Sequence, residues 1–266
     1  MNQLLISHEI SVMSYNIRYG TADDGENHWE KRKNKVADLI NYYAPDFIGM
    51  QEAQRFQQEF LLGQLPQYAS IGKPRTNDEN AEYSNIFYNK NRFELIQQRT
   101  FWLSPTPDTI STGWDAALSR IATYGLFRSL ESKRFVWVMN AHFDHVGSQA
   151  RLESARLIIA TIATLKKINN CEVIFTGDLN ARPEEAPVTY LSENLSEARS
   201  HCQTKPYGEQ DTWNGFNFKE KPNGQIDYIF IDDTKVMQVS KYITIDDFYD
   251  FKYPSDHLPV MATLSW

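Results

Sequence analysis

Polar side chains at the ends of apolar segments are the residues of this sequence that could do chemistry. They supply carboxylates, amides and imidazoles, and they are Asn16, Glu52, His142, Asp178, Asn180, Asp227, Asp256 and His257. Carboxylate and amide oxygens are hard ligands for Mg²⁺ or Mn²⁺, and imidazoles exchange protons near neutral pH. The combination therefore indicates a metal-assisted acid–base site where strands run into loops.

Each of these residues alone has a plainer explanation. An Asp or Asn after a strand is usually a turn residue that satisfies local backbone groups. An isolated histidine such as His142 is more often a hydrogen-bonded structural residue than a catalyst. So many polar residues at successive strand edges are harder to explain by turns alone, and we keep the catalytic interpretation beside the structural one.

Hydrophobic periodicity predicts the elements that must position these side chains. The predicted strands are Ile10–Ile17, Asp46–Met50, Tyr83–Tyr88, Phe93–Leu103, Ile121–Ser129, Arg134–Phe143, Cys171–Thr176, Gln225–Ile231, Val236–Ile245 and His257–Leu264. The predicted helices are Trp29–Tyr43, Phe56–Leu65 and Gln149–Lys167. This mixture predicts an α+β layered architecture, with two sheets packed face to face and helices outside. No linker, repeat or low-complexity tract interrupts the pattern, so a single domain over residues 1–266 is expected.

The composition is that of an ordinary globular protein: 266 residues, 41% hydrophobic and 23% charged, with a formal net charge of -7. Cys171 and Cys202 support neither a disulfide framework nor a zinc site. Met1–Ile10 lacks the basic flank and cleavage site of a signal peptide. The apolar run Leu157–Leu165 is shorter than the roughly 20 residues of a membrane span. We therefore expect a cytoplasmic protein with no membrane segment.

The site residues belong to motifs that follow in the order Asn16, Gln51-Glu52, His142, Gly177-Asp178-Leu179-Asn180, Asp227 and Ser255-Asp256-His257. In these motifs the sequence resembles the endonuclease/exonuclease/phosphatase superfamily. Phe101–Ser104 together with Gly113–Ala117 is similar to a bacterial subgroup whose substrate is unassigned. The resemblance implies a four-layer αββα sandwich of the DNase I-like type, with two mostly antiparallel sheets flanked by helices. It places the site at one edge of the two sheets.

The resemblance also implies a divalent cation, Mg²⁺ or Mn²⁺. Glu52, Asn16 and Asp256 would hold it, and the cation would neutralise phosphate oxygens and polarise the phosphorus. Arg18 stands where the abasic-site nucleases of this superfamily carry an acid. That difference argues against a second metal at this position.

The remaining residues acquire roles in phosphoester hydrolysis from the same resemblance. Asp178 would orient and deprotonate the attacking water, and Asn180 would hydrogen-bond the phosphorus centre as its charge builds. His257 would lie beside a phosphate oxygen or the water, with its tautomer fixed by Asp227. His142 would stabilise or protonate the leaving oxygen. Which histidine donates the proton is open at this stage.

Further residues are candidates for substrate binding, each with a structural alternative. Arg120 could grip a phosphate through its planar guanidinium, or simply begin a strand. Arg151, in the first turn of a predicted helix, could add to an anion site. Asp144 could contact substrate or metal, or act as a turn residue. Trp213 could form an aromatic wall for a base or ring, or pack as part of a lid.

These observations predict a Mg²⁺- or Mn²⁺-dependent phosphodiesterase that cleaves a nucleotide or single-stranded nucleic acid by in-line attack of water. The alternatives are a phosphomonoesterase acting on a small phosphorylated metabolite and a non-catalytic protein that binds a phosphorylated ligand. The acidic net charge of -7 disfavours duplex DNA as a partner, because duplex binding needs a basic face. The oligomeric state is not predicted.

Overall fold

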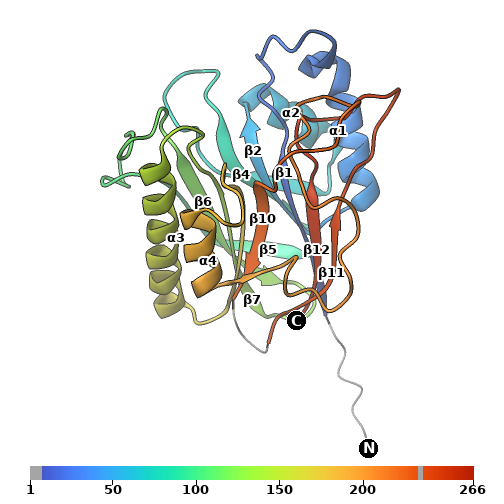
Figure 1. Cartoon of the computed structure of the whole chain (residues 1–266). Coiled ribbons are helices and arrows are strands. Elements are labelled where there is room, and N and C mark those ends of the chain that lie inside the picture. Colours follow the sequence, from blue (N-terminus) through green and yellow to red (C-terminus); the bar gives the residue numbers. More distant parts are fainter. Residues whose placement is uncertain (1–7, 233–235) are drawn as a thin grey trace, which may run out of the picture.

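Two β-sheets pack face to face, and a pair of helices covers the outer face of each sheet (Figure 1). The computed structural model describes residues 8–232 and 236–266. Residues 1–7, most of the Met1–Ile10 segment in which no signal peptide is expected, lie outside these residues.

The described strands form two six-stranded sheets. The first has the order β11-β12-β1-β2-β4-β3 and contains β1 (Glu9–Asn16), β2 (Phe47–Ala53), β3 (Tyr68–Ile71), β4 (Tyr83–Asn89), β11 (Gln238–Thr244) and β12 (Val260–Ser265). The second has the order β5-β6-β7-β8-β10-β9 and contains β5 (Phe93–Trp102), β6 (Ile121–Ser129), β7 (Phe135–His142), β8 (Glu172–Asp178), β9 (Ser196–Glu197) and β10 (Asp227–Ile231).

Three hydrophobic layers hold the sandwich together. One lies between the sheets and includes Val12, Val138 and Ile174. The first sheet packs on its outer side against α1 (Trp29–Tyr43) and α2 (Arg55–Gln64). The second packs against α3 (Ser148–Ile168) and α4 (Ala186–Asn194), and a short 3₁₀ helix, η1 (Gly25–Asn27), precedes α1. The predicted layered architecture is therefore confirmed.

Each sheet contains one parallel pair of strands, and these pairs position the site. β1 and β2 run parallel and are joined through α1, whereas β7 and β8 run parallel and are joined through α3. The other described strand pairs are antiparallel. Parallel neighbours end at the same edge of a sheet, so both pairs present their carboxyl ends together.

The elements missed by the sequence pattern are short. They are η1, β3, α4 and β9. Three predicted strands begin two or three residues later than expected: β10 starts at Asp227, β11 at Gln238 and β12 at Val260. Among the described residues, no helix is long and apolar enough to cross a membrane.

Candidate active site

A cleft of about 710 Å³ opens at the edge where the two parallel strand pairs end. Its lining includes most of the predicted site residues: Glu52, Arg120, His142, Asp178, Asn180, Trp213, Asp256 and His257. Two predicted residues, Asn16 and Asp227, lie buried immediately behind this lining. Residues predicted at the ends of separate strands therefore meet at one cleft in the folded protein.

Glu52 enters the cleft at an irregularity of β2. Its φ is 62°, in the left-handed region, and the register between β2 and β4 shifts between Gln51 and Ala53. Such a bulge redirects one side chain without ending the sheet. The carboxylate of Glu52 accepts hydrogen bonds from Asn16 Nδ2 at 3.1 Å and from the Tyr19 backbone amide at 3.0 Å.

Asn16 makes contacts that differ from those of the metal ligand that the resemblance implies. Its Nδ2 donates to Glu52 and, at 2.9 Å, to Asp178 Oδ2. Its Oδ1 accepts from the backbone amide of Arg18 at 3.0 Å. The amide nitrogen, rather than the oxygen, therefore faces the carboxylates. In this geometry Asn16 positions two acids, while its Oδ1 accepts a single hydrogen bond and keeps a second lone pair.

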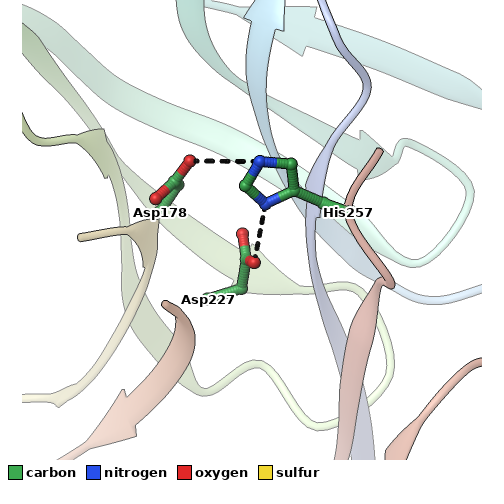
Figure 2. A group of neighbouring side chains, drawn as sticks. All are labelled: Asp178, Asp227 and His257. Atoms are coloured by element: carbon green, nitrogen blue, oxygen red, sulfur yellow. Dashed lines mark hydrogen bonds and ion pairs between the residues drawn. The ribbon is translucent and has the colours of Figure 1, made fainter. Parts of the chain in front are cut away.

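His257 lies between two carboxylates, as Figure 2 shows. Its Nδ1 is 2.8 Å from Asp227 Oδ2, and its Nε2 is 3.8 Å from Asp178 Oδ2. Asp227 also accepts from Thr212 Oγ1 at 2.6 Å. Burial lowers the pKa of His257, but the charges of Asp227 and Asp178 outweigh burial and raise this pKa well above its usual value. The His257 imidazole is therefore positively charged near neutral pH.

Asp178, at the end of β8, faces residues of both neighbouring strands of its sheet. It lies opposite His142 in the pairing of β7 and β8, and opposite Asp227 in the pairing of β8 and β10. Burial, followed by the charge of Asp227, raises the pKa of Asp178 to about 7. A carboxylate with this pKa is suited to accept a proton from water at neutral pH.

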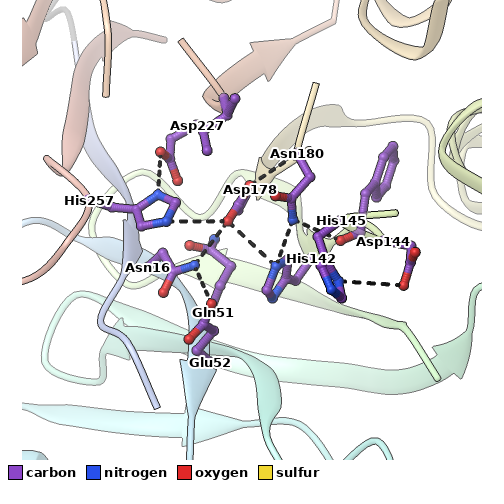
Figure 3. A network of polar contacts seen from close by, with 12 residues as sticks. Asn16, Gln51, Glu52, His142, Asp144, His145, Asp178, Asn180, Asp227 and His257 are labelled. Atoms are coloured by element: carbon purple, nitrogen blue, oxygen red, sulfur yellow. Dashed lines mark hydrogen bonds and ion pairs between the residues drawn. The ribbon is translucent and has the colours of Figure 1, made fainter. Parts of the chain in front are cut away.

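His142 is the second imidazole of the cleft, and its environment is the opposite of that around His257 (Figure 3). Asn180 Nδ2 lies 3.0 Å from His142 Nε2 and donates to the Phe143 carbonyl at 3.1 Å. Burial and then the charges of Arg120 and Arg75 lower the pKa of His142 well below its usual value. The imidazole is therefore neutral before substrate binds, and its Nε2 accepts the hydrogen bond from Asn180.

The acidic side chains of the cleft fit a hard divalent cation. Glu52 and Asp256 both line it, and burial followed by the charge of Glu52 raises the pKa of Asp256. Such like-charge repulsion is relieved by a bound cation, and carboxylates are the ligands that Mg²⁺ and Mn²⁺ prefer. Asp178, Asp227 and His257 form another possible metal site, with ligand atoms within 4.8 Å of one another. In this second group both nitrogens of His257 already face carboxylates, which favours proton transfer over metal ligation there.

Arg120 brings a buried positive charge to the cleft. Its side chain is 5% exposed; its Nε donates to Asp144 Oδ2 at 3.3 Å and its Nη2 lies 2.9 Å from His145 Nδ1. Its Nη1 is buried and has no hydrogen-bond partner. Asp144 lies outside the cleft lining and accepts backbone N–H bonds from Ala117, Leu118, Val146 and Gly147. Asp144 therefore supports Arg120 and the neighbouring loops.

The other two predicted substrate-binding residues have different placements. Trp213 lines the cleft and is 42% exposed. Arg151 lies outside the lining, and its guanidinium donates to the Asp144 carbonyl and to Glu185 Oε2. Arg151 therefore links α3 to the segment before it and to the loop between β8 and α4.

Sequence reasoning missed Arg75 and Glu82, which line the cleft from the segment between β3 and β4. Their side chains form a salt bridge of 2.7 Å. Burial and then the charge of Glu52 raise the pKa of Glu82 to about 7. Neither residue follows an apolar segment, so the strand-end pattern gave no signal for them. Further lining residues that the sequence pattern did not single out are Tyr19, Arg182 and Asn223.

Comparison with known proteins identifies the family. The model of the endonuclease/exonuclease/phosphatase family matches residues 13–257. A protein of this family from Bacteroides thetaiotaomicron superposes with a TM-score of 0.93 at 30% identity, over 98% of this chain and 96% of that one. A mannosyl-6-phosphatase from the same organism gives a TM-score of 0.92 at 31% identity, over 97% and 100%. Mouse nocturnin is 24% identical over 97% of this chain and 66% of its own. The chain therefore has the DNase I-like fold implied by its motifs, and it belongs to the endonuclease/exonuclease/phosphatase family of phosphoesterases.

Proposed function

We propose that this protein is a divalent-metal-dependent phosphomonoesterase that hydrolyses a small phosphorylated metabolite. Arg120 carries the proposal, because its buried Nη1 has no partner and its side chain lines the same cleft as Asp178 and His257. A buried guanidinium with a free donor suits a phosphate dianion. The cleft volume of about 710 Å³ is in the range of small-molecule sites.

The sequence alone favours a phosphodiesterase over a phosphomonoesterase, whereas we now favour the phosphomonoesterase. A monoester dianion concentrates two negative charges on one terminal phosphate, and the cationic side chains of Arg120 and His257 both line the cleft that would receive it. The mannosyl-6-phosphatase that aligns over 97% of this chain also favours a monoester. A phosphodiesterase acting on a nucleotide or short single strand is the second candidate, because Trp213 offers a partly exposed ring on which a base could stack.

Each of the cleft residues has a separate role in hydrolysis. A divalent cation held by Glu52 and Asp256 would neutralise phosphate oxygens and polarise the phosphorus. Asp178 accepts a proton from the attacking water as the new P–O bond forms in line with the bond that breaks. His257, kept charged by Asp227, faces the negative charge that builds on the phosphate. Asn180 lies beside both Asp178 and His142, and its Nδ2 would donate to the same centre once His142 Nε2 carries a proton and no longer accepts from it.

His142 completes the cycle at the leaving oxygen. Its pKa is lowered in part by the positive charges of Arg120 and Arg75. A bound phosphate anion offsets those charges, so substrate binding raises the pKa of His142 and prepares it to protonate the leaving oxygen. His142 therefore becomes a proton donor when the phosphate site is occupied.

The test compares 4-nitrophenyl phosphate with bis(4-nitrophenyl) phosphate in Mn²⁺, Mg²⁺ or chelator. We expect metal-dependent hydrolysis that favours the monoester, and a loss of roughly 100- to 10,000-fold in Asp178→Asn, the range for a removed general base. Asp108→Asn, at an exposed salt bridge with Arg99, is the matched control.

The other outcomes select the alternatives. Faster turnover of the diester would favour the second candidate. No turnover of either ester or of small phosphorylated metabolites, with a melting temperature raised by inorganic phosphate, would favour the non-catalytic binding protein.

A further inference from the structure

Arg75 and Glu82 form a pair in the cleft that the chemistry above does not use. Arg75 Nη2 lies 2.7 Å from Glu82 Oε1, and Arg75 Nη1 donates to Glu82 Oε2 at 3.0 Å. The two side chains are 17% and 13% exposed. This two-point contact keeps a carboxylate and a guanidinium fixed side by side at the wall of the cleft.

The backbone holds this pair in place before any ligand arrives. Pro74 and Tyr83 form an isolated antiparallel bridge, and the Arg75 amide donates to the Glu82 carbonyl at 3.0 Å. Trp102 Nε1 donates to the Arg75 carbonyl at 2.8 Å. The pair therefore sits at the closed neck of a loop, where a binding group loses little freedom when a ligand binds.

A small recess extends the cleft at this pair. It has a volume of about 10 Å³ and shares Arg75, Glu82, Arg120 and His142 with the main cleft. Ser84 and Ser119 also line it. A space of this size admits about one water molecule or one hydroxyl group. Because His142 is the residue assigned to the leaving oxygen, the recess lies on the side of the leaving group.

The chemistry of the recess selects its occupant. Each carboxylate oxygen of Glu82 keeps a lone pair beyond its bond to Arg75, so it can accept from a hydroxyl. A second phosphate is disfavoured, because the recess of about 10 Å³ is too small for it and both terminal nitrogens of Arg75 already contact Glu82. An apolar group is disfavoured too, because it would desolvate the ion pair without replacing its contacts with water. A neutral group that both donates and accepts hydrogen bonds fits best.

We propose that Arg75 and Glu82 are specificity-determining residues that bind hydroxyl groups of the leaving alcohol, so that the substrate is a phosphorylated sugar or related polyol. This inference rests on the proposed phosphomonoesterase function and adds the substrate class. Sites built to hydrogen-bond a substrate hydroxyl discriminate strongly against analogues that lack it. The pair acts on selectivity, and the bond-breaking steps remain with Asp178, His142 and His257.

The experiment measures kcat/KM for several aldohexose 6-phosphates, including mannose 6-phosphate, and for 4-nitrophenyl phosphate, which has no hydroxyl on its leaving group. The readout is the ratio of the best sugar phosphate to the aryl phosphate. In Glu82→Gln we expect this ratio to fall at least about tenfold, mainly through KM for the sugar phosphate. Arg75→Lys is a second variant, which keeps the charge but loses the planar contact with Glu82.

Glu94→Gln is the matched control, since Glu94 pairs with Arg128 outside the cleft lining. An unchanged ratio in both Glu82→Gln and Arg75→Lys would overturn the inference. So would a wild-type protein that hydrolyses the aryl phosphate as well as every sugar phosphate. A wild type that cleaves bis(4-nitrophenyl) phosphate but neither class of monoester would instead show that the proposed function itself is wrong.

Discussion

Asp227 determines which of the two cleft histidines carries a positive charge. Its Oδ2 lies 2.8 Å from His257 Nδ1, and its charge is the largest contribution that raises the pKa of His257. Asp227→Asn keeps the shape and removes that charge. We expect kcat to fall by roughly 1,000- to 10,000-fold, as for orienting carboxylates elsewhere.

Steady-state kinetics on the preferred phosphomonoester would measure this loss, with Asp108→Asn as the control. A rise in KM at unchanged kcat would contradict the assignment, because it would place Asp227 in substrate binding alone.

Asp144 provides a prediction about stability and pH. Burial raises its pKa, but backbone N–H groups of Gly147, Ala117 and Val146, helped by Arg120, outweigh burial and hold this pKa well below its usual range. Because the folded pKa is the lower one, the contacts stabilise the protein above the unfolded pKa. They are lost as pH falls through the folded pKa.

We expect Asp144→Asn to lower the free energy of unfolding by about 2 kcal/mol at neutral pH, because an amide cannot accept all these bonds. The difference from wild type should shrink as the pH falls below about 4. Urea titrations across this range would measure it. A difference that grows on acidification would have the wrong sign and would contradict the prediction.

Site residues next to predicted strand ends could be predicted, whereas Arg75 and Glu82, in the loop between β3 and β4, could not. Asp178 and Glu52 follow buried apolar runs, so their positions were marked in the sequence before the fold was known. Arg75 and Glu82 meet because Pro74 pairs with Tyr83 across a loop, and no local pattern encodes that pairing. The contact of Asn16 with Glu52 through nitrogen was also beyond the sequence, since it depends on where the Arg18 amide points.

At the scale of elements, Gly49 allows β2 to approach the second sheet closely. A Cβ added there would overlap Thr176 Oγ1 and lie 2.7 Å from Asn140 Oδ1. These polar groups belong to a buried network in which Gln51 Nε2 donates to Asn140 Oδ1 at 2.7 Å. The close approach brings the end of β2, with Glu52, near the end of β8, with Asp178.

We therefore expect Gly49→Ala to lower the free energy of unfolding by about 1–3 kcal/mol, the usual cost of overpacking a buried site. Gly63→Ala is the matched control, because nothing lies within 4 Å of an added Cβ on α2. That change should be neutral or stabilise by about 0.5–1 kcal/mol. Equal effects of the two substitutions in urea unfolding would show that the sheets do not approach as described.

Element prediction succeeded where periodicity is long. α1 over Trp29–Tyr43 and β6 over Ile121–Ser129 have the predicted bounds. β3 and β9 were not predicted, because their four and two residues are too few to show a hydrophobic period. α4 was not predicted, because its nine residues begin at Ala186-Pro187 and a proline in the first helical turn is easily read as a loop signal.

At the scale of the whole molecule, the two sheets contribute equivalent units to one site. β1-α1-β2 delivers Asn16 and Glu52, and β7-α3-β8 delivers His142 and Asp178. β10 begins at Asp227, beside these ends, and His257 precedes β12. The site is therefore complete only when both sheets are packed together, because each sheet contributes residues to it.

The distribution of charge over the molecule leads to a prediction about partners. The chain carries a formal net charge of -7, while the positive charges of Arg75, Arg120 and His257 lie inside the cleft. Positive charge held in a cleft attracts a small anion, whereas duplex DNA requires a basic outer face. We expect inorganic phosphate to inhibit hydrolysis of the preferred phosphomonoester competitively, and duplex DNA to cause no inhibition even at low salt. Initial rates with each competitor, at low and high salt, would measure this. Inhibition by the duplex that disappears as salt is added would reveal a basic track on the surface and would contradict the prediction, because release of counterions from bound DNA produces that salt dependence.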